Sequence, residues 1–181
     1  MKKTIGILLV LAVAATAVAV GRGGSDKVRI GSGSISALSR AARPKDRLPA
    51  EILAFPFAEH NFASPTGAGS RLIQSDGPLN LYAVPGKSGM VCLVEVDELA
   101  QTSGAACADR SVLLTGSIFM SDRNEDGTQQ VAGLVGDGHT YAEANGKRVG
   151  IERNAFLLRG VQGGEITIGS ATASQTVEIG G

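Results

Sequence analysis

Short apolar runs separated by turn dipeptides constrain this chain more than any other feature. From Leu72 onward, dipeptides such as Asp76-Gly77, Asp137-Gly138 and Asn145-Gly146 interrupt runs rich in leucine and β-branched residues. These dipeptides favour tight turns, and no run between them has a long helical period. We expect strands over residues 79–84, 90–96, 111–120, 129–135, 139–144, 147–151, 154–159, 165–168 and 175–179. The pattern predicts a mainly β fold, as a single small antiparallel β-sandwich or partly open barrel.

The clearest local unit is a hairpin around Asn145-Gly146, since this dipeptide favours the left-handed conformations of a type I′ turn. A two-residue loop sets the register and hence the face of every side chain. On the buried face we expect Ala142 opposite Val149 and Thr140 opposite Ile151. The exposed face then pairs Glu143 with Arg148, Tyr141 with Gly150 and His139 with Glu152. His139, Tyr141 and Glu152 could line a site, and the alternative is a cross-strand charge pair with no further role.

The two cysteines predict a disulfide. Cys92 lies in an apolar run and Cys107 in a stretch of small residues that we expect to be a loop, 15 positions later. In an exported chain such a pair is normally bonded. A redox pair would instead show Cys-x-x-Cys spacing or an activating helix, and neither is visible in the sequence.

Residues 1–20 have the features of a signal peptide or membrane anchor. Met1-Lys2-Lys3 precedes an uncharged, almost wholly apolar run over residues 4–20, which we expect to be helical. Ala17-Val18-Ala19 offers the small residues that a signal peptidase reads, so cleavage and retention both stay open. Arg22, Lys27 and Arg29 after the run would favour a cytoplasmic C-terminus by charge alone. The short N-terminal run and the two cysteines lead us to predict export, to the outer face of the membrane or into the medium.

The rest of the chain divides into two parts of opposite charge. Residues 21–49 carry seven basic and two acidic side chains, a net charge of +5, and residues 50–181 carry eight basic and fifteen acidic ones, a net charge of −7. Residues 21–49 are rich in glycine and serine and have few large apolar groups. We therefore expect a flexible basic stalk with at most one helical turn near residues 36–42, followed by a β-rich domain over residues 50–181. The stalk could contact anionic lipids or wall polymers, or be a plain solvated linker.

No motif in the sequence predicts a catalytic, cofactor or metal site. Asp122, Asn124 and Asp126 match the first half of a calcium loop, but the twelfth position is Gly133 and not a glutamate. Gly86-Lys87-Ser88 lacks the first glycine of a phosphate-binding loop. Neither a nucleophile elbow nor Ser-x-x-Lys occurs, and the acidic, aromatic-poor domain offers no basic stacking surface for nucleic acid.

The order of several short motifs resembles a group of uncharacterised exported or membrane-anchored actinobacterial proteins with a small Cys-paired β domain. The matching positions are Arg43-Pro44, Asp46, Leu48-Pro49, Ser70-Arg71-Leu72, Tyr82 to Gly86, Val91 to Val94, Ala106-Cys107, Gly133 to Gly138 and Arg153 to Phe156. The resemblance covers about residues 40–160, and it departs at Gly136, where such proteins often have proline. It implies structural motifs and no established activity.

Taken together, the sequence predicts an exported, envelope-associated, non-enzymatic β module that binds an unidentified protein or envelope polymer. The alternative is a hydrolase or other enzyme whose cleft includes His139 and Glu152.

Overall fold

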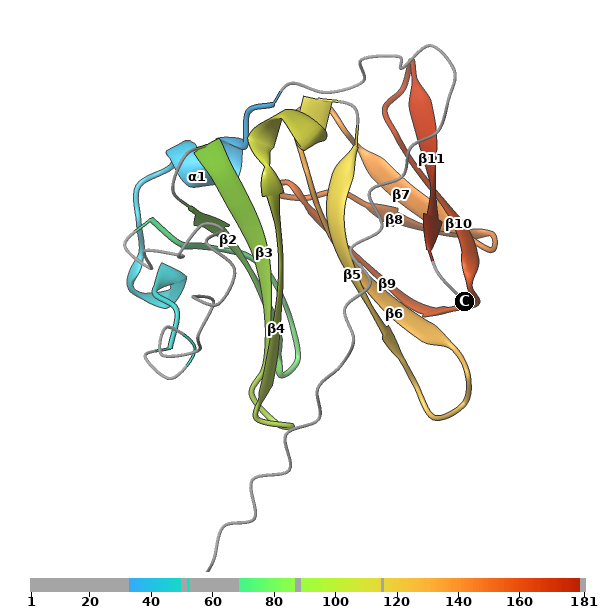
Figure 1. Ribbon diagram of the computed structural model, residues 1–181, viewed down its shortest axis with the longest axis horizontal. Helices are drawn as coiled ribbons and strands as arrows, with labels where there is room; N and C mark the ends of the chain where they lie inside the picture. Colours follow the sequence, from blue (N-terminus) through green and yellow to red (C-terminus); the bar gives the residue numbers. More distant parts are fainter. Residues whose placement is uncertain (1–32, 50–51, 53–68, 87–88, 115, 180–181) are drawn as a thin grey trace, which may run out of the picture.

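The computed structural model describes residues 33–49, 52, 69–86, 89–114 and 116–179 (Figure 1). The predicted signal peptide or anchor over residues 1–20 lies outside them. The elements are α1 (Ser36–Ser39), η1 (Pro44–Asp46), β1 (Arg71–Asp76), β2 (Leu79–Pro85), β3 (Met90–Asp97), β4 (Thr102–Asp109), η4 (Arg110–Leu114), β5 (Ser117–Arg123), β6 (Gln129–Val135), β7 (Tyr141–Ala144), β8 (Lys147–Gly150), β9 (Ala155–Val161), β10 (Gly164–Gly169) and β11 (Ser174–Ile179).

The strands form three antiparallel sheets, which confirms the mainly β prediction. The first sheet has the order β1-β2-β3-β4, the central sheet β5-β6-β9 and the third sheet β11-β10-β7-β8. The architecture is that of a small β-sandwich, and the described strands do not close into a barrel. In Figure 1 the central sheet lies between the other two.

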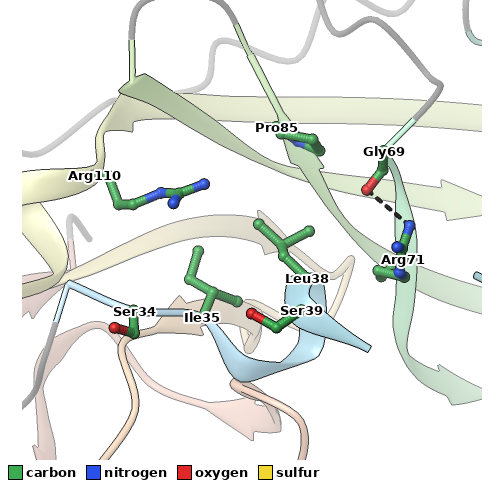
Figure 2. A pocket seen from close by; sticks show the side chains of 8 residues that line it. All are labelled: Ser34, Ile35, Leu38, Ser39, Gly69, Arg71, Pro85 and Arg110. Atoms are coloured by element: carbon green, nitrogen blue, oxygen red, sulfur yellow. Dashed lines mark hydrogen bonds between the residues drawn. The ribbon is translucent and has the colours of Figure 1, made fainter. Parts of the chain in front are cut away.

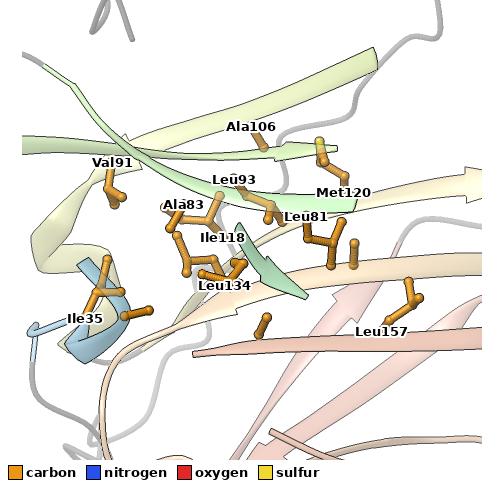
Figure 3. Packing of buried hydrophobic residues seen from close by; sticks show 14 of the residues in the cluster. Ile35, Leu81, Ala83, Val91, Leu93, Ala106, Ile118, Met120, Leu134 and Leu157 are labelled. Carbon is orange, nitrogen blue, oxygen red and sulfur yellow. The ribbon is translucent and has the colours of Figure 1, made fainter. Parts of the chain in front are cut away.

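Two apolar layers separate the three sheets. Between the first and central sheets, Leu81 and Leu93 pack with Ile118, Leu134 and Leu157 (Figure 3). On the other face of the central sheet, a second cluster unites side chains of the central and third sheets: Val131, Phe156, Leu158, Ile166 and Ile168. A sheet buried on both faces needs apolar residues at successive positions, which explains the continuous apolar runs in β6 and β9.

Gly133 and Phe156 show how closely the central sheet is packed. The two residues are direct cross-strand partners on β6 and β9. A Cβ atom on Gly133 would lie 2.1 Å from Cε1 of Phe156, so the ring occupies the space that any larger residue would need. Gly133 is therefore a packing residue of the second core.

The predicted hairpin register is confirmed within β7 and β8, but just before β7 the expected faces are wrong: His139 is buried and Thr140 is exposed, because β7 begins only at Tyr141. β7 and β8 pair Tyr141 with Gly150, Ala142 with Val149 and Glu143 with Arg148. Asn145 and Gly146 have φ of 49° and 74°, the left-handed values that the two-residue turn requires.

Three sequence-based boundaries differ from the structure. β1 was not among the predicted strands, and Cys107 lies in β4 and not in a loop. The predicted strand over residues 111–120 begins instead with the 3₁₀ helix η4, which buries Leu113, and only then continues as β5. β4 lacks the usual signal because most of its residues are small rather than β-branched.

Residues 33–49 pack on the first sheet, whereas we expected a flexible stalk here. Ile35, Ala37 and Leu48 are buried, with exposed fractions of 3%, 4% and 1%. The expected single helical turn is present as α1. Composition alone did not predict that this segment packs on the sheet, because only a few apolar side chains and a polar network hold it there.

Among the described residues, no helix is both long enough and apolar enough to cross a membrane.

Candidate functional site

A cavity of about 340 Å³ lies where the N-terminal segment meets the first sheet (Figure 2). Its lining comes from α1 and the residues before it, from the end of the β1–β2 pair where β1 begins and β2 ends, and from the start of η4. The lining residues are Ser34, Ile35, Leu38, Ser39, Gly69, Arg71, Pro85 and Arg110. The cavity thus combines an apolar wall with two hydroxyls and two guanidinium groups, and none of its lining residues is acidic.

Arg71 is held firmly by backbone carbonyls. Its Nε and Nη2 donate to the carbonyl oxygen of Arg40 at 3.0 and 2.9 Å. Its Nη1 donates to the carbonyl oxygens of Gly69 and Ser70 at 3.1 and 2.8 Å. A guanidinium has five N–H groups, so one N–H of Nη2 has no partner among the described residues. These acceptors are all carbonyls without net charge, so no described residue forms an ion pair with Arg71.

Arg110 enters the cavity from the opposite side. Figure 2 shows its side chain extending from η4 toward the space between Pro85 and Ile35. No hydrogen bond or ion pair to any described residue engages its guanidinium. The neighbouring Asp109 accepts from the backbone N–H of Ser111 at 2.8 Å instead. With respect to the described residues, Arg110 therefore presents an uncompensated charge and a full set of donors.

An ion pair with a buried carboxylate fixes the wall that carries Arg71. The Nη1 of Arg40 donates to Oδ2 of Asp46 at 2.6 Å, and the backbone N–H groups of Arg43 and Leu72 donate to the same carboxylate at 2.6 and 3.0 Å. The hydrogen bond from Arg40, followed by those from the two backbone groups, holds the pKa of Asp46 well below its usual range despite burial. This carboxylate joins η1 to β1 and to Arg40, which follows α1, and so fixes the segment next to Arg71.

A second polar network attaches α1 to the loops of the central sheet. The side-chain oxygen of Asn154 accepts from the N–H of Ala37 at 3.0 Å and from the hydroxyl of Ser36 at 3.1 Å. Its amide nitrogen donates to Asp137 at 2.7 Å, and Asp137 also accepts from the N–H of Ser36 at 2.9 Å. The positions of Ile35 and Leu38 in the cavity wall depend on this attachment.

The structure does not bring His139 and Glu152 together as a charge pair. His139 is buried, and its Nδ1 lies 3.0 Å from the carbonyl oxygen of Gly136. The other ring nitrogen, Nε2, is buried without a hydrogen-bond partner among the described residues. Glu152 is exposed and forms an isolated backbone bridge with Ala155. Neither residue lines the cavity described above.

Tyr141 has a structural environment. Arg148 stacks on its ring at 3.9 Å from the centroid and also forms an ion pair with Glu143 at 2.7 Å. The ring lies over Gly169, where a Cβ atom would be 2.7 Å from the hydroxyl. We expected it to face Gly150, its backbone partner, but no atom lies within 4 Å of a Cβ placed there.

The calcium-like segment forms a hydrogen-bonded loop between β5 and β6. Asp126 accepts from the backbone N–H and the hydroxyl of Thr128 at 2.9 and 2.6 Å, and the amide of Asn124 donates to the same hydroxyl. These contacts are internal to the turn. In the described parts of the chain, no group of three or more His, Cys, Asp or Glu residues is arranged to hold a metal ion.

The predicted disulfide is present. Cys92 and Cys107 are direct partners on β3 and β4, with Cα atoms 4.0 Å apart, and their sulfurs are bonded. Cys92 is completely buried on the outer face of the first sheet, next to Val84 and Val94. The bridge therefore crosslinks two neighbouring strands inside an apolar cluster.

Sequence reasoning missed a buried carboxyl between the first and central sheets. Glu95 on β3 is only 8% exposed, and Nε2 of Gln130 on β6 donates to it at 3.3 Å. Burial, together with the charge of Asp122 and a hydrogen bond to it, raises the pKa of Glu95 to about 7. Below this pKa, Glu95 is protonated and can donate to the Asp122 carboxylate. Strand alternation could have indicated this, because Glu95 falls on the same face of β3 as Val91 and Leu93.

A comparison with family models, with curated proteins and with solved structures finds no match to this chain.

The cavity residues were also missed as a site. Arg71 belongs to one of the short motifs that resemble the actinobacterial proteins, and we interpreted those motifs as structural. Arg110 and Ser34 belong to no motif. The cavity brings together positions 34–39, 69–71, 85 and 110, which only the chain topology makes neighbours.

Proposed function

We propose that the protein is an exported, envelope-associated binding module without enzymatic activity. The observation that carries the export part is the Cys92–Cys107 disulfide. Structural disulfides form and persist in oxidising compartments and are rare in the cytosol. The apolar run over residues 4–20 agrees with this location.

The binding part is supported by the cavity. Its guanidinium groups and hydroxyls retain donors that the described residues do not use. A concave site with few convergent polar groups on an apolar wall is the usual form of a ligand site. The partner class suggested by the sequence, a protein or an envelope polymer, is part of the same proposal.

The enzymatic alternative has weaker support. It needs His139 as a base in a cleft with Glu152, and the Nδ1 of His139 lies against its own turn while Glu152 is exposed elsewhere on the hairpin. A general base must reach the proton that it abstracts.

Protease accessibility tests the location. Protease added to intact cells should digest the β domain, while a cytosolic marker in the same sample stays intact. Lysed cells serve as the control that both proteins can be cleaved. Protection of the domain until lysis would contradict export.

A further inference from the structure

We propose that the cavity binds a small amphiphile whose single oxyanion head is held by Arg110, within the field of the fixed charge of Arg71, and whose short apolar chain lies on Ile35, Leu38 and Pro85 (Figure 2). The proposal names the ligand class of the binding module and rests on that binding role, but not on export.

The charge of the ligand head follows from the two arginines. Arg110 has no partner among the described residues, and Arg71 has only neutral carbonyl partners. A third arginine, Arg40, lies close by, but Asp46 neutralises it. Within the described part of the chain, an anion in the cavity therefore meets two positive charges without an ion-pair partner and no lining carboxylate. Guanidinium groups bind carboxylate and phosphate oxygens in paired geometry, so an oxyanion suits these donors.

Donor geometry assigns different roles to the two arginines. Arg71 cannot turn toward a ligand, because four of its five N–H groups are committed to carbonyls of its own wall. It supplies a fixed charge and one remaining N–H. Arg110 has an exposed side chain whose donors no described residue occupies, so it can close on the head group. Ser34 and Ser39 also line the cavity. Ser34 lies just before α1, and Ser39 is its last residue.

The apolar part of the ligand follows from the wall. Ile35 is 3% exposed and Leu38 is partly buried against the first core cluster, so their positions are set by the fold. Pro85 is rigid and packs against Gly69, where a Cβ atom would lie 2.5 Å from its ring. A volume of about 340 Å³ is near the lower limit for ligand pockets, which favours one short chain over a diacyl lipid.

Calorimetric titration of the full chain with decanoate and with monodecyl phosphate tests the proposal. We expect saturable binding at one site for at least one of these amphiphiles, and their relative affinities identify the preferred head. Acetate and inorganic phosphate, which lack the chain, and decyltrimethylammonium, which has the opposite charge, should bind at least tenfold more weakly. Absence of saturable binding by both amphiphiles, or equal binding of the cationic one, would overturn the proposal.

Two arginine variants locate the binding. Arg110→Gln should weaken binding roughly tenfold, the value of one charged hydrogen bond of about 1.4 kcal/mol. Arg123→Gln is the matched control, because Arg123 is exposed and lies at the end of β5 far from η4, and it should leave affinity unchanged. Equal losses in both variants would show nonspecific attraction and refute the site.

A measurement on the unmodified protein covers the case in which Arg110→Gln fails to fold. Addition of the bound amphiphile should shift the backbone amide signals of Ser34, Leu38 and Arg71. Shifts confined to other sheets would place the ligand elsewhere and reject this cavity. Because these experiments use purified protein, their failure leaves the protease test of export unaffected.

Discussion

Glu95 is the side chain whose protonation should affect this fold most. It lies between the first and central sheets, where Asp122, Asp97 and Arg159 are the charged groups that act on it. Burial and the two neighbouring carboxylates favour the neutral acid more than Arg159 favours the ionised one. The Gln130 amide joins the two sheets at this end by donating to Glu95, and below a pKa of about 7 the protonated Glu95 can also bond to Asp122.

This arrangement predicts a loss of stability as pH rises. The ordinary pKa of 4.5 applies in the unfolded chain and a pKa of about 7 in the folded protein, so between these values the folded state binds more protons. The contribution of Glu95 is fully present below about pH 4.5 and is lost as pH rises through about 7. We expect a fall on the order of 2 kcal/mol in the free energy of unfolding, measured by urea denaturation at a series of pH values, after allowance for solvent screening.

Glu95→Gln should remove this pH dependence, because the amide keeps a hydrogen bond without titrating. Glu165→Gln is the control, since Glu165 is exposed at the start of β10 and its loss should leave the pH profile unchanged. A profile of Glu95→Gln parallel to that of the wild type across this window would show that Glu95 titrates normally.

At the scale of elements, the attachment of residues 33–49 to the first sheet depends on the Asp46 carboxylate. It accepts from Arg40, from the N–H of Arg43 and from the N–H of Leu72, and it is almost fully buried. Removal of its charge leaves Arg40 without its partner and two backbone donors with a weaker acceptor.

Asp46→Asn should therefore destabilise the protein by about 3 kcal/mol, as is typical when one member of a buried ion pair is removed. Hydrogen exchange should accelerate at the amides of Arg43 and Leu72 before the central sheet is affected. Asp126→Asn, in an exposed turn, should change stability by less than about 0.5 kcal/mol. Unchanged exchange at Leu72 in Asp46→Asn would disprove the role assigned to this carboxylate.

Elements with a strong local pattern could be predicted from the sequence, whereas those defined by their neighbours could not. The β7–β8 hairpin follows from Asn145-Gly146, and β6 from its apolar run, because local chemistry determines both. β4 is formed by pairing with β3, and its small residues carry little strand signal of their own. Arg71 and Arg110 became a candidate site only through packing, since each looks like an ordinary surface charge in the sequence.

At the scale of the whole molecule, a central sheet buried on both faces is combined with a first sheet that has an apolar outer face. That outer face includes Val84, Cys92 and Val94, all with 0% exposure, and Leu48 packs on it. The disulfide joins β3 to β4 within this cluster, at the edge of the first sheet. With so few aromatic residues in the chain, a covalent link between strands is a substantial part of its stability.

Non-reducing peptide mapping of protein purified from cells without reductant, with free thiols alkylated at lysis, tests the central claim of a disulfide-closed exported module most directly. We expect the peptides that contain Cys92 and Cys107 to be recovered as one linked species. Reduction of the purified protein should then lower its free energy of unfolding by about 2 to 5 kcal/mol. Recovery of both cysteines in alkylated form would contradict the bridge and, with it, the proposed location outside the cytoplasm.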